Sequence, residues 1–184
     1  MKETEYTYLS AFMNITRAIN SSLNLQEVLN QIVKSTCETT SSKGCALLLL
    51  DEGGEQLEVV SSCGLSDQYV RKGPLSADKS IFDTLKGKPV IIEDAVSDPR
   101  VQYPLEAKQE GIASIISLPI ILRGAVIGVL RLYTGVPCRF EQDDIDFLSA
   151  IAMQSALAIE NAKMFEHVKK DYRKLMSSSS ATAE

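Results

Sequence analysis

GIASIISLPIILRGAVIGVLRLY, residues 111–133, carries the strongest β-strand pattern in the chain. Two runs rich in Ile, Leu and Val, 112–121 and 125–133, flank the dipeptide Arg123-Gly124. Two apolar runs separated by a two-residue turn that includes glycine are typical of a β-hairpin. We therefore expect two long antiparallel strands joined at Arg123-Gly124.

Outward from this hairpin, helices and strands do not alternate regularly along the chain. The expected order begins with helices at 4–23 and after Asn24, strands at 45–51 and 56–62, and short helices capped by Ser66 and Asp78. A strand at 88–93, a short helix entered at Asp98-Pro99, the hairpin and a long helix at 141–176 follow. Such an order favours helices packed on an antiparallel sheet over a doubly wound parallel sheet. We predict an α+β fold with a central antiparallel sheet of five to six strands.

Composition narrows the classes of protein and partner. The 184 residues are 45% hydrophobic and 23% charged, with a net charge of −5, which is typical of one globular domain. No basic stretch predicts nucleic-acid binding, and no apolar run reaches the roughly 18 residues of a membrane span. The N-terminus lacks a signal-peptide pattern, so we expect a cytoplasmic protein that contacts neither nucleic acid nor membrane.

Arg131 is a charged residue within an apolar strand. A two-residue turn pairs residues so that one face carries Ser114 beside Arg131 and Tyr133, and the other face carries Ser117. Burial of an unpaired charge is costly. Arg131 therefore either lines a pocket and meets an anion or polar ligand, or pairs with a protein carboxylate or reaches water at the sheet rim.

Four stretches together resemble a known family. They are SLNLQEVLNQIV (22–33), VIIEDAVSDPRV (90–101), the hairpin sequence (111–133) and FEQDDIDFLSAIAMQSALAIENA (140–162). Over about residues 5–168 the chain resembles a GAF domain, a small-molecule sensing fold of signalling proteins and phosphodiesterases. The resemblance implies long helices on one face of the sheet, and short helices and loops from about 65 to 111 that roof a pocket on the other.

The ligand classes of this family are not indicated by the sequence. Thr134-Gly135 stands where cyclic-nucleotide-binding members carry Asn-Lys, and Phe140 with Ile145 is explained as a hydrophobic staple that starts the last helix. Bilin-binding members need a cysteine that the region 64–137 lacks, and the sole histidine, His167, lies beyond the domain body. The cofactor is therefore left unknown, and the cysteine spacing predicts no metal site.

Catalysis is not expected from this residue set. The family's one thiol enzyme, free methionine-R-sulfoxide reductase, needs cysteines in the pocket loops, where 64–137 has none. We expect a non-catalytic sensor domain that binds an unidentified small polar ligand; the alternatives are a ligand-free dimerisation module and, less favoured, a reductase-like thiol enzyme. The candidate ligand-binding residues are Asp94, Arg100, Tyr103, Ser114, Arg131 and Tyr133.

The last helix carries an apolar seam beyond the domain body. Phe165, Val168, Tyr172 and Leu175 follow the spacing of a coiled coil. We expect a parallel homodimer through the first and last helices, with Phe12, Ile15, Ile19, Ile151, Ala158 and the four seam residues at its interface. The expected segments are a dimerisation helix (1–24), the GAF domain body (25–164), a coiled-coil extension (165–176) and a disordered tail (177–184). Output would pass to a downstream signalling protein or lie outside this chain.

Overall fold

The computed structural model describes residues 2–22, 24–76 and 82–180, and for 2–4, 166–167 and 174–180 it describes the backbone alone. Its centre is an antiparallel six-stranded sheet in the order β3-β2-β1-β6-β5-β4. The strands are β1 (Gly44–Leu50), β2 (Gln56–Cys63), β3 (Leu75–Ser76), β4 (Val90–Ile92), β5 (Ser114–Leu122) and β6 (Ala125–Thr134). The predicted α+β fold and antiparallel sheet are confirmed.

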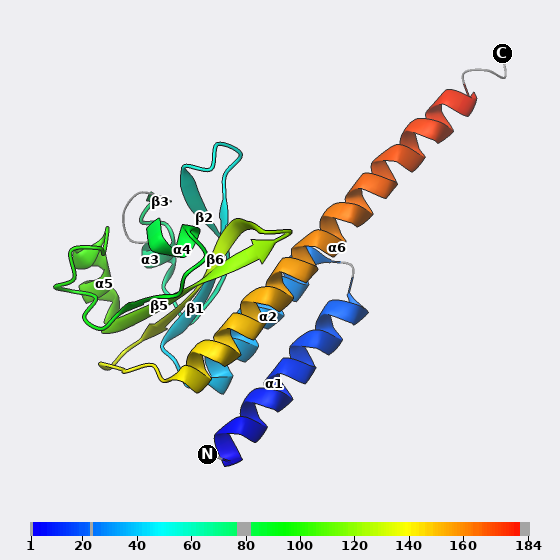
Figure 1. Cartoon of the computed structure of the whole chain (residues 1–184). Coiled ribbons are helices and arrows are strands. Elements are labelled where there is room, and N and C mark those ends of the chain that lie inside the picture. Colours follow the sequence, from blue (N-terminus) through cyan, green and yellow to red (C-terminus); the bar gives the residue numbers. More distant parts are fainter. Residues whose placement is uncertain (1, 23, 77–81, 181–184) are drawn as a thin grey trace.

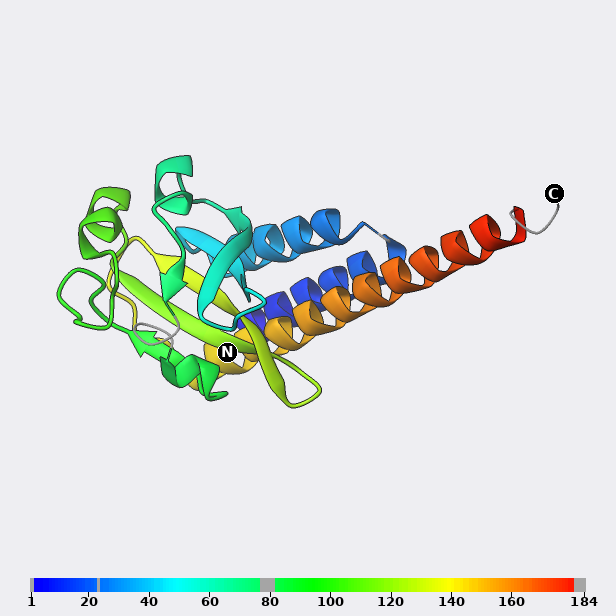
Figure 2. The same ribbon diagram turned by 90° about the horizontal axis from the view of Figure 1, so that it is seen from above.

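The helices form one layer on each side of the sheet (Figures 1 and 2). The long helices α1 (Lys2–Ser21), α2 (Leu25–Thr39) and α6 (Gln142–Ser180) cover one face. The short helices α3 (Asp67–Val70), α4 (Phe82–Leu85) and α5 (Pro104–Glu110) belong to the other side. Ser66 caps α3 as predicted, whereas Asp78 lies outside the described residues.

β1 separates two apolar cores because it is apolar on both faces. Cys45 and Leu47 pack under the long helices, while Ala46 and Leu48 pack on the side of the short helices. β6 lies against β1 so closely that a Cβ on Gly128 would stand 2.3 Å from the Leu48 carbonyl oxygen. Only glycine allows this approach of the two central strands.

α1 runs parallel to α6 and is fixed to its start. The Tyr8 ring stacks on Phe147 with centroids 4.2 Å apart, and its hydroxyl donates to the Asp144 carboxylate at 2.6 Å. Burial, followed by Asp144, raises the pKa of Tyr8, so the hydroxyl stays protonated and keeps this hydrogen bond. Phe140 and Ile145 pack on the same core, which is consistent with the predicted staple at the start of α6.

The hairpin turn is as predicted, but the pairing beyond it corrects the expected faces of β5. Arg123 and Gly124 both have positive φ, 51° and 84°, as a tight hairpin turn requires. A bulge beside Ile120 leaves one extra residue on β6 and changes the register. Ser117 therefore pairs with Arg131 and shares its face, and Ser114 lies on the opposite face. A one-residue shift exchanges every side chain between faces, which turn length alone does not reveal.

α6 is longer than predicted and extends past the rest of the molecule (Figure 1). It ends at Ser180 rather than Met176, so 177–180 is helical where a disordered tail was expected, and 181–184 lies outside the described residues. None of the helices in the described part of the chain combines the length and apolar composition of a membrane span.

The predicted dimer seam needs correction within the domain body. Four of its members are buried inside the chain itself and cannot contact a second copy: Ile15, Ile19, Ile151 and Ala158. Phe12 is half-buried against the same core. Phe165, Val168 and Tyr172 are exposed, and the side chain of Leu175 lies outside the described residues. A heptad pattern does not distinguish packing on the chain's own sheet from packing on a partner.

Candidate functional site

Arg131 lies at the centre of β6 on the side of the short helices. Only 3% of it is exposed, and its Nε donates to the Ser117 hydroxyl at 3.0 Å. The guanidinium carbon lies 5.9 Å from the centre of the Tyr133 ring. No ion pair of Arg131 with a carboxylate exists among the residues that the structure describes. Of the predicted alternatives, pairing with a protein acid is therefore not observed in this part of the chain.

Two tyrosines form an aromatic wall beside Arg131. The rings of Tyr69 and Tyr133 meet edge to face, with centroids 5.8 Å apart at 87°. The Ser66 hydroxyl accepts from the Tyr69 backbone N–H and so starts the short helix that carries Tyr69. Burial raises the pKa of both phenols, so they remain neutral. The wall presents rings and hydroxyl groups, not negative charge.

Lys72 brings a second cation to the site, which the sequence analysis missed. Its Nζ lies 3.7 Å from the centre of the Tyr69 ring and 5.8 Å from that of Tyr103. Burial, and then the positive charge of Arg131, lower its pKa to about 8, although Glu106 and Glu110 act in the opposite direction. No periodic pattern in the sequence marks this residue, because a short turn-rich segment presents it.

Tyr103 holds the loop that carries Lys72. Its hydroxyl donates to the Pro74 carbonyl oxygen at 3.0 Å. The preceding Gly73 has φ of +123°, and a Cβ there would stand 2.8 Å from the Tyr103 hydroxyl. Glycine is therefore required by both conformation and space. Tyr103, a predicted site residue, joins the site through Lys72.

Thr84 of α4 is a second residue that the sequence analysis missed. Its hydroxyl is buried and has no hydrogen-bond partner among the described residues. The neighbouring Leu85 packs on the apolar cluster that contains Tyr133, which places α4 on the side of Arg131. A buried hydroxyl without a partner is unusual, because such groups are normally satisfied by protein, water or ligand.

The side chains of Asp94 and Arg100 form hydrogen bonds within their own loop and to β4. The Asp94 carboxylate accepts from the Ser97 hydroxyl at 2.6 Å and the Val96 N–H at 2.9 Å, which lowers its pKa. Arg100 forms a two-nitrogen pair with Asp98, and it also donates to the Ile91 carbonyl oxygen at 3.0 Å. These contacts fix the 94–100 loop to β4. The prediction that both residues face a ligand is not supported by these contacts.

Ser114 is also structural. Its hydroxyl donates to the Glu93 carbonyl oxygen at 2.7 Å and accepts from the Cys138 N–H at 3.0 Å. It thus joins the start of β5 to the connector that follows β6. Its place in the predicted site is corrected by the bulge in the hairpin, which turns it to the face opposite Arg131.

Three of the four cysteines lie on the opposite side of the sheet from Arg131. Cys45 and Cys63 pair across β1 and β2 and pack with Cys37 under the long helices. Burial raises the pKa of Cys37, Cys45 and Cys138, which keeps these thiols protonated and weakly nucleophilic. Within the described part of the chain, no group of three or more His, Cys, Asp or Glu could hold a metal ion.

Fold and site together define an α+β domain whose sheet buries one arginine within an otherwise largely apolar face. A sequence model of the GAF domain matches residues 22–160, which is most of the chain. The chain therefore belongs to the GAF domain family, whose members are sensor and regulatory domains of signalling proteins.

Similar proteins are larger and diverse. The chain is 23% identical over 158 residues to an Escherichia coli protein of the phosphoenolpyruvate-dependent phosphotransferase system, covering 85% of this chain and 21% of that protein. It is 23% identical over 180 residues to a probable 3',5'-cyclic phosphodiesterase of Caenorhabditis elegans, covering 90% of this chain and 25% of that protein. The chain thus spans about a quarter or less of these relatives.

A solved structure supports the same fold. It is the GAF domain of a phosphoenolpyruvate-protein phosphotransferase from Coxiella burnetii, with a TM-score of 0.78 and 22% identity. The match covers 88% of this chain and 98% of that domain. At this identity the similarity shows the fold alone, so the ligand has to be inferred from the residues of this chain.

Proposed function

We propose that this domain senses a small anionic molecule that binds beside Arg131, on the side of the sheet that carries the short helices. The single observation that carries the proposal is a buried guanidinium with no carboxylate partner among the described residues. An uncompensated buried cation costs several kcal/mol, of order the penalty for one desolvated ion. A carboxylate or phosphate of a ligand would offset that cost.

The neighbouring groups support an anion rather than a cation. Burial lowers the pKa of Lys72 most, and the charge of Arg131 lowers it further, so a nearby anion would stabilise both cations. The Ser117 hydroxyl adds a polar partner beside Arg131, and the Tyr69 and Tyr133 rings add apolar walls. This combination suits a ligand with a charged end and a small organic body.

A binding experiment tests this proposal with two probes, inorganic phosphate and succinate. Calorimetric titration of the full chain is expected to give saturable binding of at least one probe. Arg131→Met should weaken it at least tenfold, because a charge-assisted hydrogen bond contributes about 1.5–3 kcal/mol. Arg71→Met, which removes an exposed arginine one residue from Lys72, is the matched control and should bind as the original chain does.

The two probes also distinguish the source of the anion. Succinate binding alone indicates a carboxylate ligand, and phosphate binding alone indicates a phosphorylated one. A folded Arg131→Met variant that binds either probe with unchanged affinity would contradict the proposal. Native mass spectrometry of the protein purified without additives would then support the alternative, a ligand-free dimerisation module, if no bound molecule is found.

For the output of the domain, we propose a homodimer through α1 and α6 that relays ligand binding to a downstream signalling protein. The observation that favours it is an exposed apolar stripe on α6, formed by Met153, Leu157, Met164 and Val168. α1 adds the exposed Tyr6, Leu9 and Met13 at helical spacing. Exposed apolar stripes of this size favour a partner. Light scattering should find a dimer at micromolar concentration, and a monomer for the double variant Leu157→Glu, Met164→Glu.

A further inference from the structure

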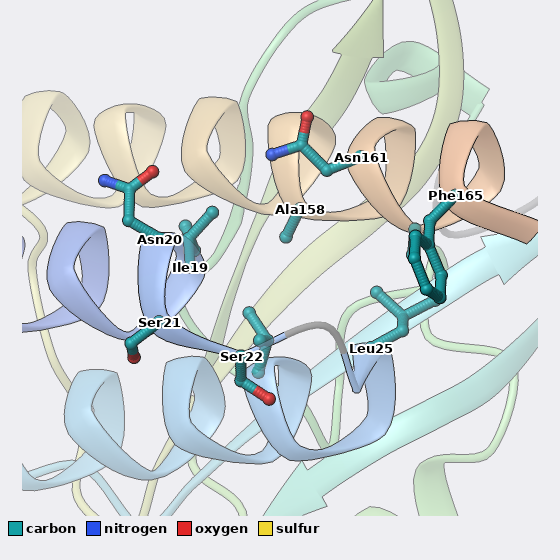
Figure 3. A pocket seen from close by; sticks show the side chains of 10 residues that line it. Ile19, Asn20, Ser21, Ser22, Leu25, Ala158, Asn161 and Phe165 are labelled. Atoms are coloured by element: carbon teal, nitrogen blue, oxygen red, sulfur yellow. The ribbon is translucent and has the colours of Figure 1, made fainter.

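A cavity of about 240 Å³ lies at the junction of the three long helices, away from Arg131 (Figure 3). α1 ends at Ser21 and α2 begins at Leu25, while α6 continues past both. At this point α6 loses its neighbour and runs on alone (Figure 1). The cavity is bounded on α6 by the small side chains Ala158 and Ala162, which leave the space unfilled.

The cavity has an apolar interior and a polar rim. Ile19, Val28 and Ala158 are buried at its base, and Leu25 and Phe165 meet at one end (Figure 3). The rim carries the side-chain amides of Asn20 and Asn161, one from α1 and one from α6. Neither amide has a hydrogen-bond partner among the described residues, whereas the rim hydroxyl groups of Ser21 and Ser22 bond to Ala18 and Glu27.

The lining does not favour anionic ligands. None of the described residues that line the cavity is positively charged, and the Glu27 carboxylate accepts from the Ser22 hydroxyl at the rim. An anionic molecule would lose hydration without gaining a counter-ion among these residues. The anion proposed beside Arg131 would therefore not be retained in this cavity.

We propose that this junction cavity binds a small uncharged molecule with an apolar ring and one or two hydroxyl or carbonyl groups. An apolar cavity of about 150 Å³ holds benzene, so the larger junction cavity has room for a substituted ring. The ring would pack on the apolar lining residues, and the polar substituents would face the polar rim. Such a ligand contacts α1, α2 and α6 at once and fastens α6 where it leaves the body.

Phenol is the probe for this site, and benzoate is its charged counterpart. Titration of the full chain, followed by amide NMR shifts, is expected to show saturable phenol binding with shifts concentrated at residues that line the cavity. Ala162→Leu fills the cavity and should weaken phenol binding at least tenfold. Ala150→Leu is the matched control, since it places the same side chain at another half-buried α6 position outside the cavity. Benzoate should bind at least tenfold more weakly than phenol.

A cross-test separates this site from the proposed anion site. Arg131→Met should leave phenol binding unchanged, and Ala162→Leu should leave the binding of phosphate or succinate unchanged. Phenol binding that does not saturate, or that survives in a helical and folded Ala162→Leu variant, overturns the proposal. Should phenol fail to bind while Ala162→Leu shifts the monomer–dimer equilibrium, the cavity belongs to the contact between two copies and the proposal is also overturned.

Discussion

The two faces of the central sheet bury different chemistry, although β6 contributes to both. Towards the long helices β6 places Leu130 and Leu132, which pack in an almost entirely aliphatic core. Towards the short helices the same strand places Val129, Arg131 and Tyr133, where apolar packing is interrupted by charge and hydroxyl groups. One strand therefore contributes to an aliphatic core on one side and buries a charged side chain on the other.

This difference shows where the fold tolerates an energetic cost. The helix-side core has side chains of complementary shape and no buried charge among its members. The opposite side keeps a buried guanidinium, a lysine with a lowered pKa and a buried hydroxyl that has no partner among the described residues. Local departures from efficient burial are expected at functional sites, where stability is exchanged for binding. Substitutions on the two faces should accordingly change the unfolding free energy by different amounts and in different directions.

The largest expected effect is on the helix side. Leu130→Ala removes a fully buried side chain and leaves a cavity between the sheet and the long helices. Such substitutions cost about 2–5 kcal/mol of unfolding free energy. Chemical denaturation monitored by circular dichroism measures the change. A loss below about 1 kcal/mol would mean that this core repacks freely, and the contrast between the faces would disappear.

On the opposite face, Arg131→Met should leave the unfolding free energy unchanged or raise it in the absence of ligand. Methionine fills much of the space without a charge to desolvate, and replacing a poorly compensated buried charge is often neutral or stabilising by about 1–4 kcal/mol. Ser117 loses its partner in this variant, so the double variant Arg131→Met, Ser117→Ala removes that contribution. A loss of about 3–5 kcal/mol in the double variant would instead reveal a carboxylate pair outside the described residues.

Much of this contrast could be predicted from the sequence, because periodicity reports burial. The apolar runs of β5 and β6 and the Arg123-Gly124 turn predict the hairpin, and Arg131 stands out as the one charge within them. The bulge beside Ile120 could not be predicted, since no residue type there requires an extra residue on β6. It moved Ser114 off the predicted face and Ser117 onto it.

The other errors of the sequence analysis also arise from tertiary contacts that the sequence does not reveal. Lys72 and Thr84 lie on short segments whose positions are set by tertiary contacts such as that between Tyr103 and Pro74. Asp94 and Arg100 were predicted to contact a ligand because the sequence does not reveal which polar side chains of a loop hydrogen-bond within that loop. Likewise, Ile151 and Ala158 fit a heptad, but they are buried within the chain itself.

The lowered pKa of Lys72 allows a pH titration to test the polar side of the sheet. Its pKa is lowered from 10.5 to about 8 in the folded chain, so between these values the unfolded chain binds more protons. Relative to Lys72→Met, the original chain should therefore gain unfolding free energy as the pH rises above about 8. Urea denaturation of both proteins between pH 7.5 and 9.5 measures this difference. Cys37, Cys45 and Cys138, whose pKa values are raised, oppose the gain in both proteins alike and so cancel in the comparison. Identical slopes in both proteins would contradict the assigned burial of Lys72.

The smallest effect is expected at the rim between the hairpin and α6. Arg123 Nε donates to the Glu160 carboxylate at 2.9 Å, but the arginine side chain is largely exposed. Exposed ion pairs contribute about 0–1 kcal/mol because solvent and salt screen them. Glu160→Gln should therefore change the unfolding free energy by less than about 1 kcal/mol, and less still in added salt. A loss comparable with that of Leu130→Ala would show that the contact of the hairpin tip with α6 contributes as much stability as the helix-side core. The stability of the chain would then depend on this edge as well as on the two faces of the sheet.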